Sequence, residues 1–263
     1  MENSTRHSEG KVSIYKVLPS AITIIGMCFG LTSIRMSLDG YYELAVSLIL
    51  LAAVADGLDG LVARQLNAVS KFGAELDSLT DFLCFGVAPA ILMYCMFTNA
   101  LGSFGWGATL VYVAASCLRL ARFNAFQQSS INPEPDEINA APEPHPNHEK
   151  PKTHFVGVPA PGAALLVLLP VFVTFASSQS IVISPYFVTI WLCIIGTLMI
   201  SRLKTFSPKT IRIPRRSVTL SLLFIVALAA ILYSYTWQTF MILSIIYTCM
   251  LIVDVIKAKG RII

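Results

Sequence analysis

Long apolar segments that alternate with short polar connections dominate this chain of 263 residues. A helix needs about 20 apolar residues to cross the hydrocarbon core of a bilayer, and eight segments approach or exceed that length. They run near 17–37, 42–63, 74–98, 102–124, 156–177, 181–201, 217–234 and 237–256. Because 55% of the residues are hydrophobic and only 13% are charged, a bilayer accommodates the chain better than water does. We therefore predict an all-α, polytopic membrane helix bundle of about eight transmembrane helices.

The basic residues predict how this bundle lies in the membrane. With eight spans and both termini in the cytoplasm, 18 of the 19 lysines and arginines fall on the cytoplasmic side, and only Arg35 falls on the other. This asymmetry is what the positive-inside rule requires. We expect an integral protein of the cell (inner) membrane whose termini both face the cytoplasm.

The polar stretches between the apolar segments predict how the chain divides into regions. We expect a cytoplasmic N-terminal segment at 1–16, a transmembrane core at 17–203 with a solvated loop at 127–154, a basic loop at 204–216, and two final helices with a short tail at 217–263. Topology and anionic lipid headgroups account for the basic loop, so we expect no nucleic-acid partner. The final two segments carry no charge before Asp254 and are expected to serve packing. The six cysteines show no CxxC pairing that would indicate a zinc site.

Four aspartates mark the chemistry, at the predicted cytoplasmic ends of the second and third segments. At 100° per residue, five residues of the second helix project within one arc about 140° wide. These residues are Asp56, Asp59, Gly60, Ala63 and Arg64. The third helix carries Gly73, Asp77 and Asp81 as one stripe at i, i+4 and i+8. The short connection makes the two helices antiparallel neighbours, so these stripes can face each other.

Such a crowd of carboxylates requires neutralisation. At about 6 Å and an effective dielectric near 20, each pair costs about 3 kcal/mol. Oxygen ligands suit Mg²⁺ or Mn²⁺, and two such ions could clamp a pyrophosphate. Acidic residues within spans also occur on the ion or proton paths of transporters, but those are expected near the midplane on broken helices.

The arrangement D-x2-D-G-x2-A-R-x8-G-x3-D-x3-D over residues 56–81 resembles the signature of the CDP-alcohol phosphotransferase family. The resemblance implies a six-helix catalytic core, a homodimer and a two-metal centre that opens to the cytoplasm. It implies that Asp56, Asp59 and Asp77 bind metal, and that Asp81 contacts metal and deprotonates the acceptor hydroxyl. It also implies that the nucleotide lies beside Asp59, Gly60, Ala63, Arg64 and Gly73.

Two further stretches bear on the acceptor alcohol. Residues 117–124 and 155–164 resemble those of phosphatidylserine synthases that use CDP-diacylglycerol, which implies transfer of a phosphatidyl group to L-serine with release of CMP. The serine carboxylate calls for an arginine, and the nearest candidates are Arg119, Arg122 and Asn124. The arginines could instead serve only as interface anchors. Choline, which favours an aromatic cage, and glycerol 3-phosphate remain alternative acceptors; a cation or proton transporter remains the alternative of another class.

Overall fold

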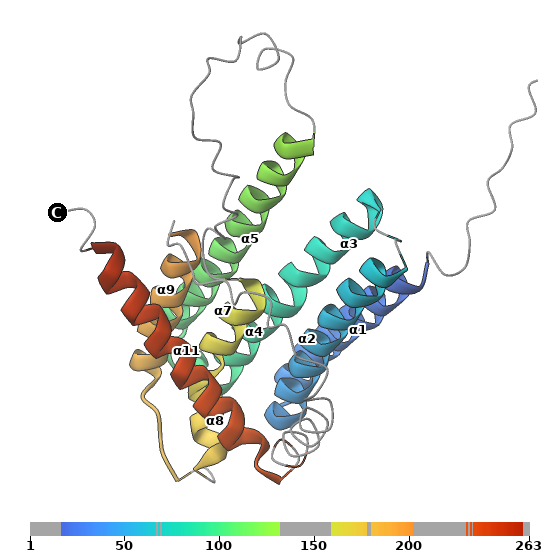
Figure 1. The fold of residues 1–263 in the computed structure, drawn as a ribbon. Coiled ribbons are helices and arrows are strands. Elements are labelled where there is room, and N and C mark those ends of the chain that lie inside the picture. Colours follow the sequence, from blue (N-terminus) through green and yellow to red (C-terminus); the bar gives the residue numbers. More distant parts are fainter. Residues whose placement is uncertain are drawn as a thin grey trace, which may run out of the picture.

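The structure, a computed structural model, describes residues 17–66, 68, 70–131, 159–177, 180–201, 230, 232 and 234–259. All elements in these ranges are helices, which confirms the predicted all-α class (Figure 1). Five helices in the described part are long and apolar enough to cross a membrane, and α9 is a shorter apolar helix. The predicted segment 217–234 lies almost entirely outside the described residues, so the expected number of eight spans stays a prediction. The segment 1–16 and the loop 204–216 lie outside them too.

The helices follow the predicted segments closely. The long ones are α1 (Leu18–Leu38), α2 (Tyr42–Gln65), α5 (Ser103–Ile131) and α11 (Thr236–Lys259). The third span is continuous from Lys71 to Leu101 and comprises α3 (Lys71–Asp81), a wider-turned stretch (Phe82–Val87), α4 (Ala88–Met93) and two short terminal turns. The remaining helices are α7 (Ala160–Val167), α8 (Leu169–Ala176) and α9 (Pro185–Ile200). Helix α5 continues to Ile131, beyond the predicted start of a loop at 127.

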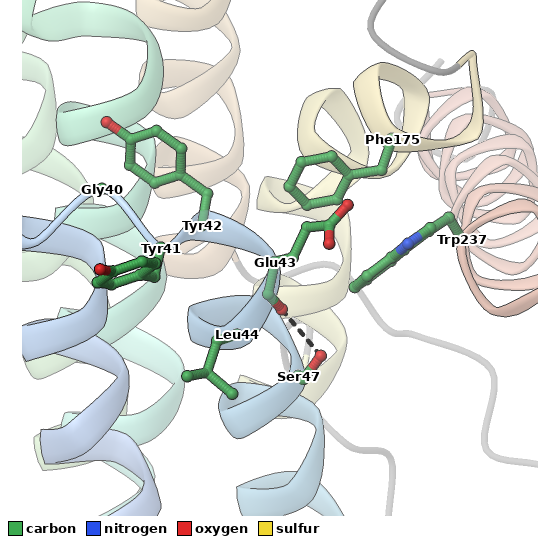
Figure 2. A pocket seen from close by; sticks show the side chains of 8 residues that line it. All are labelled: Gly40, Tyr41, Tyr42, Glu43, Leu44, Ser47, Phe175 and Trp237. Carbon is green, nitrogen blue, oxygen red and sulfur yellow. Dashed lines mark hydrogen bonds between the residues drawn. The ribbon is translucent and has the colours of Figure 1, made fainter.

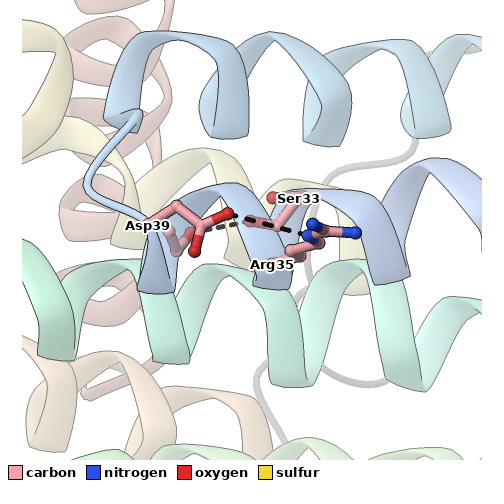
Figure 3. A network of polar contacts seen from close by, with 4 residues as sticks. Ser33, Arg35 and Asp39 are labelled. Carbon is pink, nitrogen blue, oxygen red and sulfur yellow. Dashed lines mark hydrogen bonds and ion pairs between the residues drawn. The ribbon is translucent and has the colours of Figure 1, made fainter.

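A tight hairpin joins α1 to α2. Gly40 adopts φ 83°, a left-handed conformation that favours glycine. The buried Ser33 hydroxyl then donates to the Ala45 carbonyl across the hairpin at 2.8 Å. Arg35 pairs with Asp39 at 3.7 Å in the last turn of α1 (Figure 3). Arg35, the one basic residue predicted outside the cytoplasmic side, is thus partly neutralised by its own helix.

Two prolines interrupt the backbone ladder within spans, and side chains from neighbouring helices compensate. Pro89 has no N–H for the Phe85 carbonyl four residues earlier, and the buried Tyr112 hydroxyl donates to that oxygen at 2.9 Å. Pro170 likewise cannot donate to the Leu166 carbonyl, which accepts from Trp191 Nε1 at 2.9 Å. In lipid, freed carbonyls need such partners. The described part of the predicted segment 156–177 is helical but is interrupted at Leu168, between α7 and α8, two residues before Pro170.

One end of the bundle gathers the predicted cytoplasmic helix ends. The last turns of α2, α5 and α9 and the first turn of α3 all lie at the end that is uppermost in Figure 1. The α1–α2 hairpin with Arg35 lies at the opposite end. The acidic segments of α2 and α3 therefore lie at the same end of the bundle, and α1 packs against both helices.

Candidate active site

The acidic side chains of α2 and α3 converge. Asp56, Asp59 and Asp77 each offer a carboxylate oxygen, and these atoms lie within 4.8 Å of one another. Asp59 is buried, and the other two are half-buried. The facing of the two stripes that helical periodicity predicts is therefore present in the structure. The roles of the individual residues remain predictions.

Asp81 extends this cluster one turn further along α3. Its carboxyl interacts with those of Asp56 and Asp77, and its Oδ1 is buried with no hydrogen-bond partner among the described residues. Helix α3 ends at this residue, and the wider-turned stretch Phe82–Val87 follows. Such local widening is frequent at functional sites. Asp81 thus lies next to the other aspartates, and one of its oxygens has no partner among the described residues.

The chemistry of the donor set fits a divalent cation. The single ion pair found among the described residues is Arg35–Asp39, at the other end of the bundle. Within the described part, none of the clustered carboxylates forms an ion pair with a lysine or arginine, although the charge of Arg119 interacts with Asp81. Three oxygen ligands at this separation suit a hard divalent ion. Asp56, Asp59 and Asp77 could hold such an ion together.

Thr23 on α1 belongs to the site but was missed in the sequence. Its Oγ1 lies 2.6 Å from Asp59 Oδ2 and 3.0 Å from the Pro19 carbonyl. A hydroxyl has a single proton, and the shorter contact is to the charged acceptor. Both side chains are 5% exposed. Thr23 therefore holds the Asp59 carboxylate in place through its Oδ2. No motif connects two residues 36 positions apart, so no sequence signal indicated this contact.

Replacement of Thr23 by valine tests whether the hydrogen bond from Thr23 to Asp59 supports metal binding. We expect Thr23→Val to weaken Mn²⁺ binding by about 10- to 100-fold, the usual cost of losing a hydrogen bond to a metal ligand. Calorimetric Mn²⁺ titration of the purified protein measures this without turnover. Thr32→Val is the matched control, because Thr32 is exposed on the same helix and bonds only to the Cys28 carbonyl there. Thr23→Ser should restore wild-type affinity, and unchanged Mn²⁺ affinity in Thr23→Val would contradict the assignment.

The predicted nucleotide contacts lie around the end of α2 and the start of α3. A Cβ added at Gly60 would meet no atom within 4 Å, so the backbone there is open to a ligand. Arg64 is exposed, and its Nε donates to the Gly60 carbonyl at 3.0 Å. Gly73 lies in the first turn of α3, where its N–H donates to Ser70 Oγ at 3.0 Å. Ala63 is half-buried one turn beyond Asp59. Of the residues predicted to contact the nucleotide, Gly60 and Arg64 are therefore the most accessible to a ligand.

The structure distinguishes the three acceptor candidates. Arg122 is exposed, and its Nη1 donates to the Ile200 carbonyl at 3.1 Å, which caps the end of α9. Asn124 Oδ1 accepts from the Ser78 hydroxyl at 3.2 Å. Arg119 is half-buried, its Nε has no hydrogen-bond partner among the described residues, and its charge interacts with Asp81. Of the three, Arg119 is therefore the side chain available to a ligand next to the acidic cluster.

Among the cavities lined by described residues, two lie along the bundle. One, of about 520 Å³, is at the hairpin end, where Phe175 and Trp237 lie on the side toward which Glu43 extends (Figure 2). Its aromatic rings match the belt expected at a membrane interface. The other, of about 650 Å³, is an apolar groove lined by α2, α7 and α11. Its lining includes Ala53 and Val54, which lie within one turn of Asp56 on α2, but none of the four aspartates.

Known proteins are similar to this one over most of the chain. The profile of the family described as CDP-alcohol phosphatidyltransferase matches residues 16–198. A CDP-diacylglycerol–serine O-phosphatidyltransferase of Mycobacterium leprae is 36% identical over 236 residues, which cover 89% of this chain and 73% of the relative. The protein of that name from Mycobacterium bovis is 34% identical over 84% of this chain and 72% of its own. That from Bacillus subtilis is 32% identical over 71% of this chain and 88% of its own.

Proposed function

The chain belongs to the CDP-alcohol phosphatidyltransferase family, and from this premise we propose that it transfers the phosphatidyl group of CDP-diacylglycerol to the hydroxyl of L-serine. The products are phosphatidylserine and CMP. The observation that carries the choice of serine is the similarity, over most of the chain, to relatives named for that reaction. The convergence of four aspartates supports the chemistry shared by the family.

The acidic cluster suits the proposed reaction. Asp56, Asp59 and Asp77 would hold Mg²⁺ or Mn²⁺, and the family resemblance favours two ions. When bound, such ions neutralise the charge that develops on the pyrophosphate as it breaks. Asp81 accepts the proton of the serine hydroxyl, whose oxygen forms a bond to the lipid-side phosphorus. The anhydride bond on the far side of that phosphorus breaks, and CMP leaves with the electron pair.

The surroundings of the cluster suit a lipid donor. The apolar groove that begins within one turn of Asp56 can take an acyl chain while the cytidine lies beside Gly60 and Arg64. The membrane-spanning helices present a lipid substrate to this groove from the bilayer itself. A homodimer in the inner membrane, with cytoplasmic termini and a site open to the cytoplasm, completes the proposal. The basic residues at this end and the family resemblance support it.

Arg119 is the residue that we assign to the serine carboxylate. A bidentate, charge-assisted contact contributes about 1.5–3 kcal/mol, so we expect Arg119→Gln to raise the KM for serine by about 10- to 100-fold. The KM for CDP-diacylglycerol should change little. Arg122→Gln is the matched control, since that side chain is committed to the end of α9. An unchanged KM for serine in Arg119→Gln, or an equal rise in the control, would contradict the assignment.

The acceptor itself is tested with purified protein in detergent or nanodiscs. CDP-diacylglycerol and Mg²⁺ or Mn²⁺ are supplied with L-serine, inositol, glycerol 3-phosphate or choline, and CMP release is measured. Serine alone should produce CMP together with phosphatidylserine. CMP with another alcohol would keep the family chemistry and change the substrate. Metal-dependent binding of cytidine nucleotide also distinguishes this enzyme from a cation transporter.

A further inference from the structure

Helix α11 lies outside the residues that match the catalytic family, yet it packs on the catalytic core. The family profile ends at residue 198, whereas α11 begins at Thr236. Phe240 stacks on Phe172 of α8 at a centroid distance of 5.6 Å. One turn further, the fully buried Ser244 donates its hydroxyl to the Leu165 carbonyl of α7 at 3.2 Å. These contacts fix both the rotation and the height of α11 against α7 and α8.

The next side chain on this face of α11 is Tyr247, and a glycine admits it. A Cβ built at Gly162 of α7 would lie 2.8 Å from the Tyr247 hydroxyl oxygen and 3.1 Å from its Cε1. The phenol therefore lies directly against the α7 backbone, which only glycine permits without displacement. Gly162 falls within 155–164, one of the two stretches that carry the resemblance to enzymes using serine. The sequence indicated no partner for that stretch among the final helices.

The phenol of Tyr247 lies within electrostatic reach of Arg119, the residue that we assign to the acceptor. The guanidinium of Arg119 interacts electrostatically with Tyr247 as well as with Asp81. Arg119 projects from α5, Asp81 from α3 and Tyr247 from α11, so three separate helices meet around one charged group. A phenol oxygen can accept an N–H from a guanidinium while its own O–H donates to an anion. Tyr247 thus has the chemistry to orient Arg119 and to face an acceptor carboxylate.

We propose that Tyr247 is a positioning residue for Arg119, through which helix α11 sets the affinity for the acceptor alcohol. This inference rests on the proposed function, because it takes Arg119 as the group that binds the acceptor. It gives the C-terminal helix a part in substrate selection beyond the packing expected from its apolar sequence. Residues 16–198 would then supply the metal and nucleotide sites, and α11 would complete the acceptor pocket from outside them.

The first test compares two conservative variants of the full chain. Tyr247→Phe keeps the ring packed against Gly162 and removes only the hydroxyl. We expect the KM for serine to rise about tenfold, while kcat, the KM for CDP-diacylglycerol and the Tm stay within twofold or about one degree of wild type. Tyr235→Phe, an exposed tyrosine just before α11, is the control and should change nothing. An unchanged KM for serine in Tyr247→Phe, or an equal loss for both substrates, overturns the proposal.

A double-mutant cycle with Gly162→Ala provides the second test. The added methyl group displaces the phenol, so Gly162→Ala should raise the KM for serine as Tyr247→Phe does. In the double variant the methyl group no longer meets an oxygen, and the two effects should combine to less than their product. Fully multiplicative effects would overturn the coupling. If wild-type protein releases CMP with another alcohol, the proposed function fails, and the KM for that alcohol in Tyr247→Phe decides this inference separately.

Discussion

An Asp81→Asn variant is expected to bind CDP-diacylglycerol as wild type does and to release CMP at least 100-fold more slowly. Asparagine has the shape of aspartate but cannot take up the proton of an attacking hydroxyl. General base catalysis typically contributes 10²- to 10⁴-fold. The buried Oδ1 of Asp81, which has no hydrogen-bond partner among the described residues, lies beside the proposed metal ligands, where we expect it to reach an acceptor next to the pyrophosphate. Metal-dependent binding and single-turnover CMP release measure the two steps separately.

Asp39→Asn serves as the control for this variant. Asp39 is an aspartate at the opposite end of the bundle, paired with Arg35, and its loss should leave both steps unchanged. Turnover close to wild type in Asp81→Asn would remove Asp81 from the role of base. Loss of binding together with turnover would assign it to the metal set, beside Asp56 and Asp77.

The convergence of the aspartates was predictable because it depends on local geometry. Spacings of three and four residues place side chains on one helical face. The connection between α2 and α3 is too short for them to be other than antiparallel neighbours. Asp56, Asp59 and Asp77 therefore met as expected. The helical class and most boundaries followed equally directly from the length of the apolar segments.

The contacts between distant helices could not be predicted in this way. The spacing of polar residues shows which face of a helix carries the functional side chains. It does not show which neighbouring helix packs against that face. Nothing in the sequence joins Thr23 to Asp59, or Tyr247 to Gly162. Arg119 and Arg122 are separated by less than one turn, and only the position of α9 shows that Arg122 is occupied by the Ile200 carbonyl. The difference between the surroundings of these two arginines comes from tertiary packing and not from the spacing of the motif.

Asp77→Asn is expected to abolish metal-dependent turnover and to remove the stabilisation that the metal provides. Asp77 is the one member of the three-residue cluster that comes from α3, so its carboxylate would join the two helices through a bound ion. Loss of a hydrogen bond to a ligand costs about 10- to 100-fold in metal affinity, and loss of a ligand itself should cost at least about 100-fold. At a concentration 100 times its dissociation constant, a ligand stabilises the folded state by about 2.7 kcal/mol. The variant should lose that increment.

The metal-free proteins should show the opposite order of stability. Each pair of carboxylates about 6 Å apart costs roughly 3 kcal/mol at an effective dielectric near 20, and Asp77→Asn removes this repulsion. In a chelator the variant should therefore unfold at a higher Tm than wild type, whereas with saturating Mg²⁺ or Mn²⁺ wild type should have the higher Tm. Thermal unfolding with and without metal measures the crossover, and Asp39→Asn should show none. Parallel curves for Asp77→Asn and wild type would mean that these carboxylates do not share an ion.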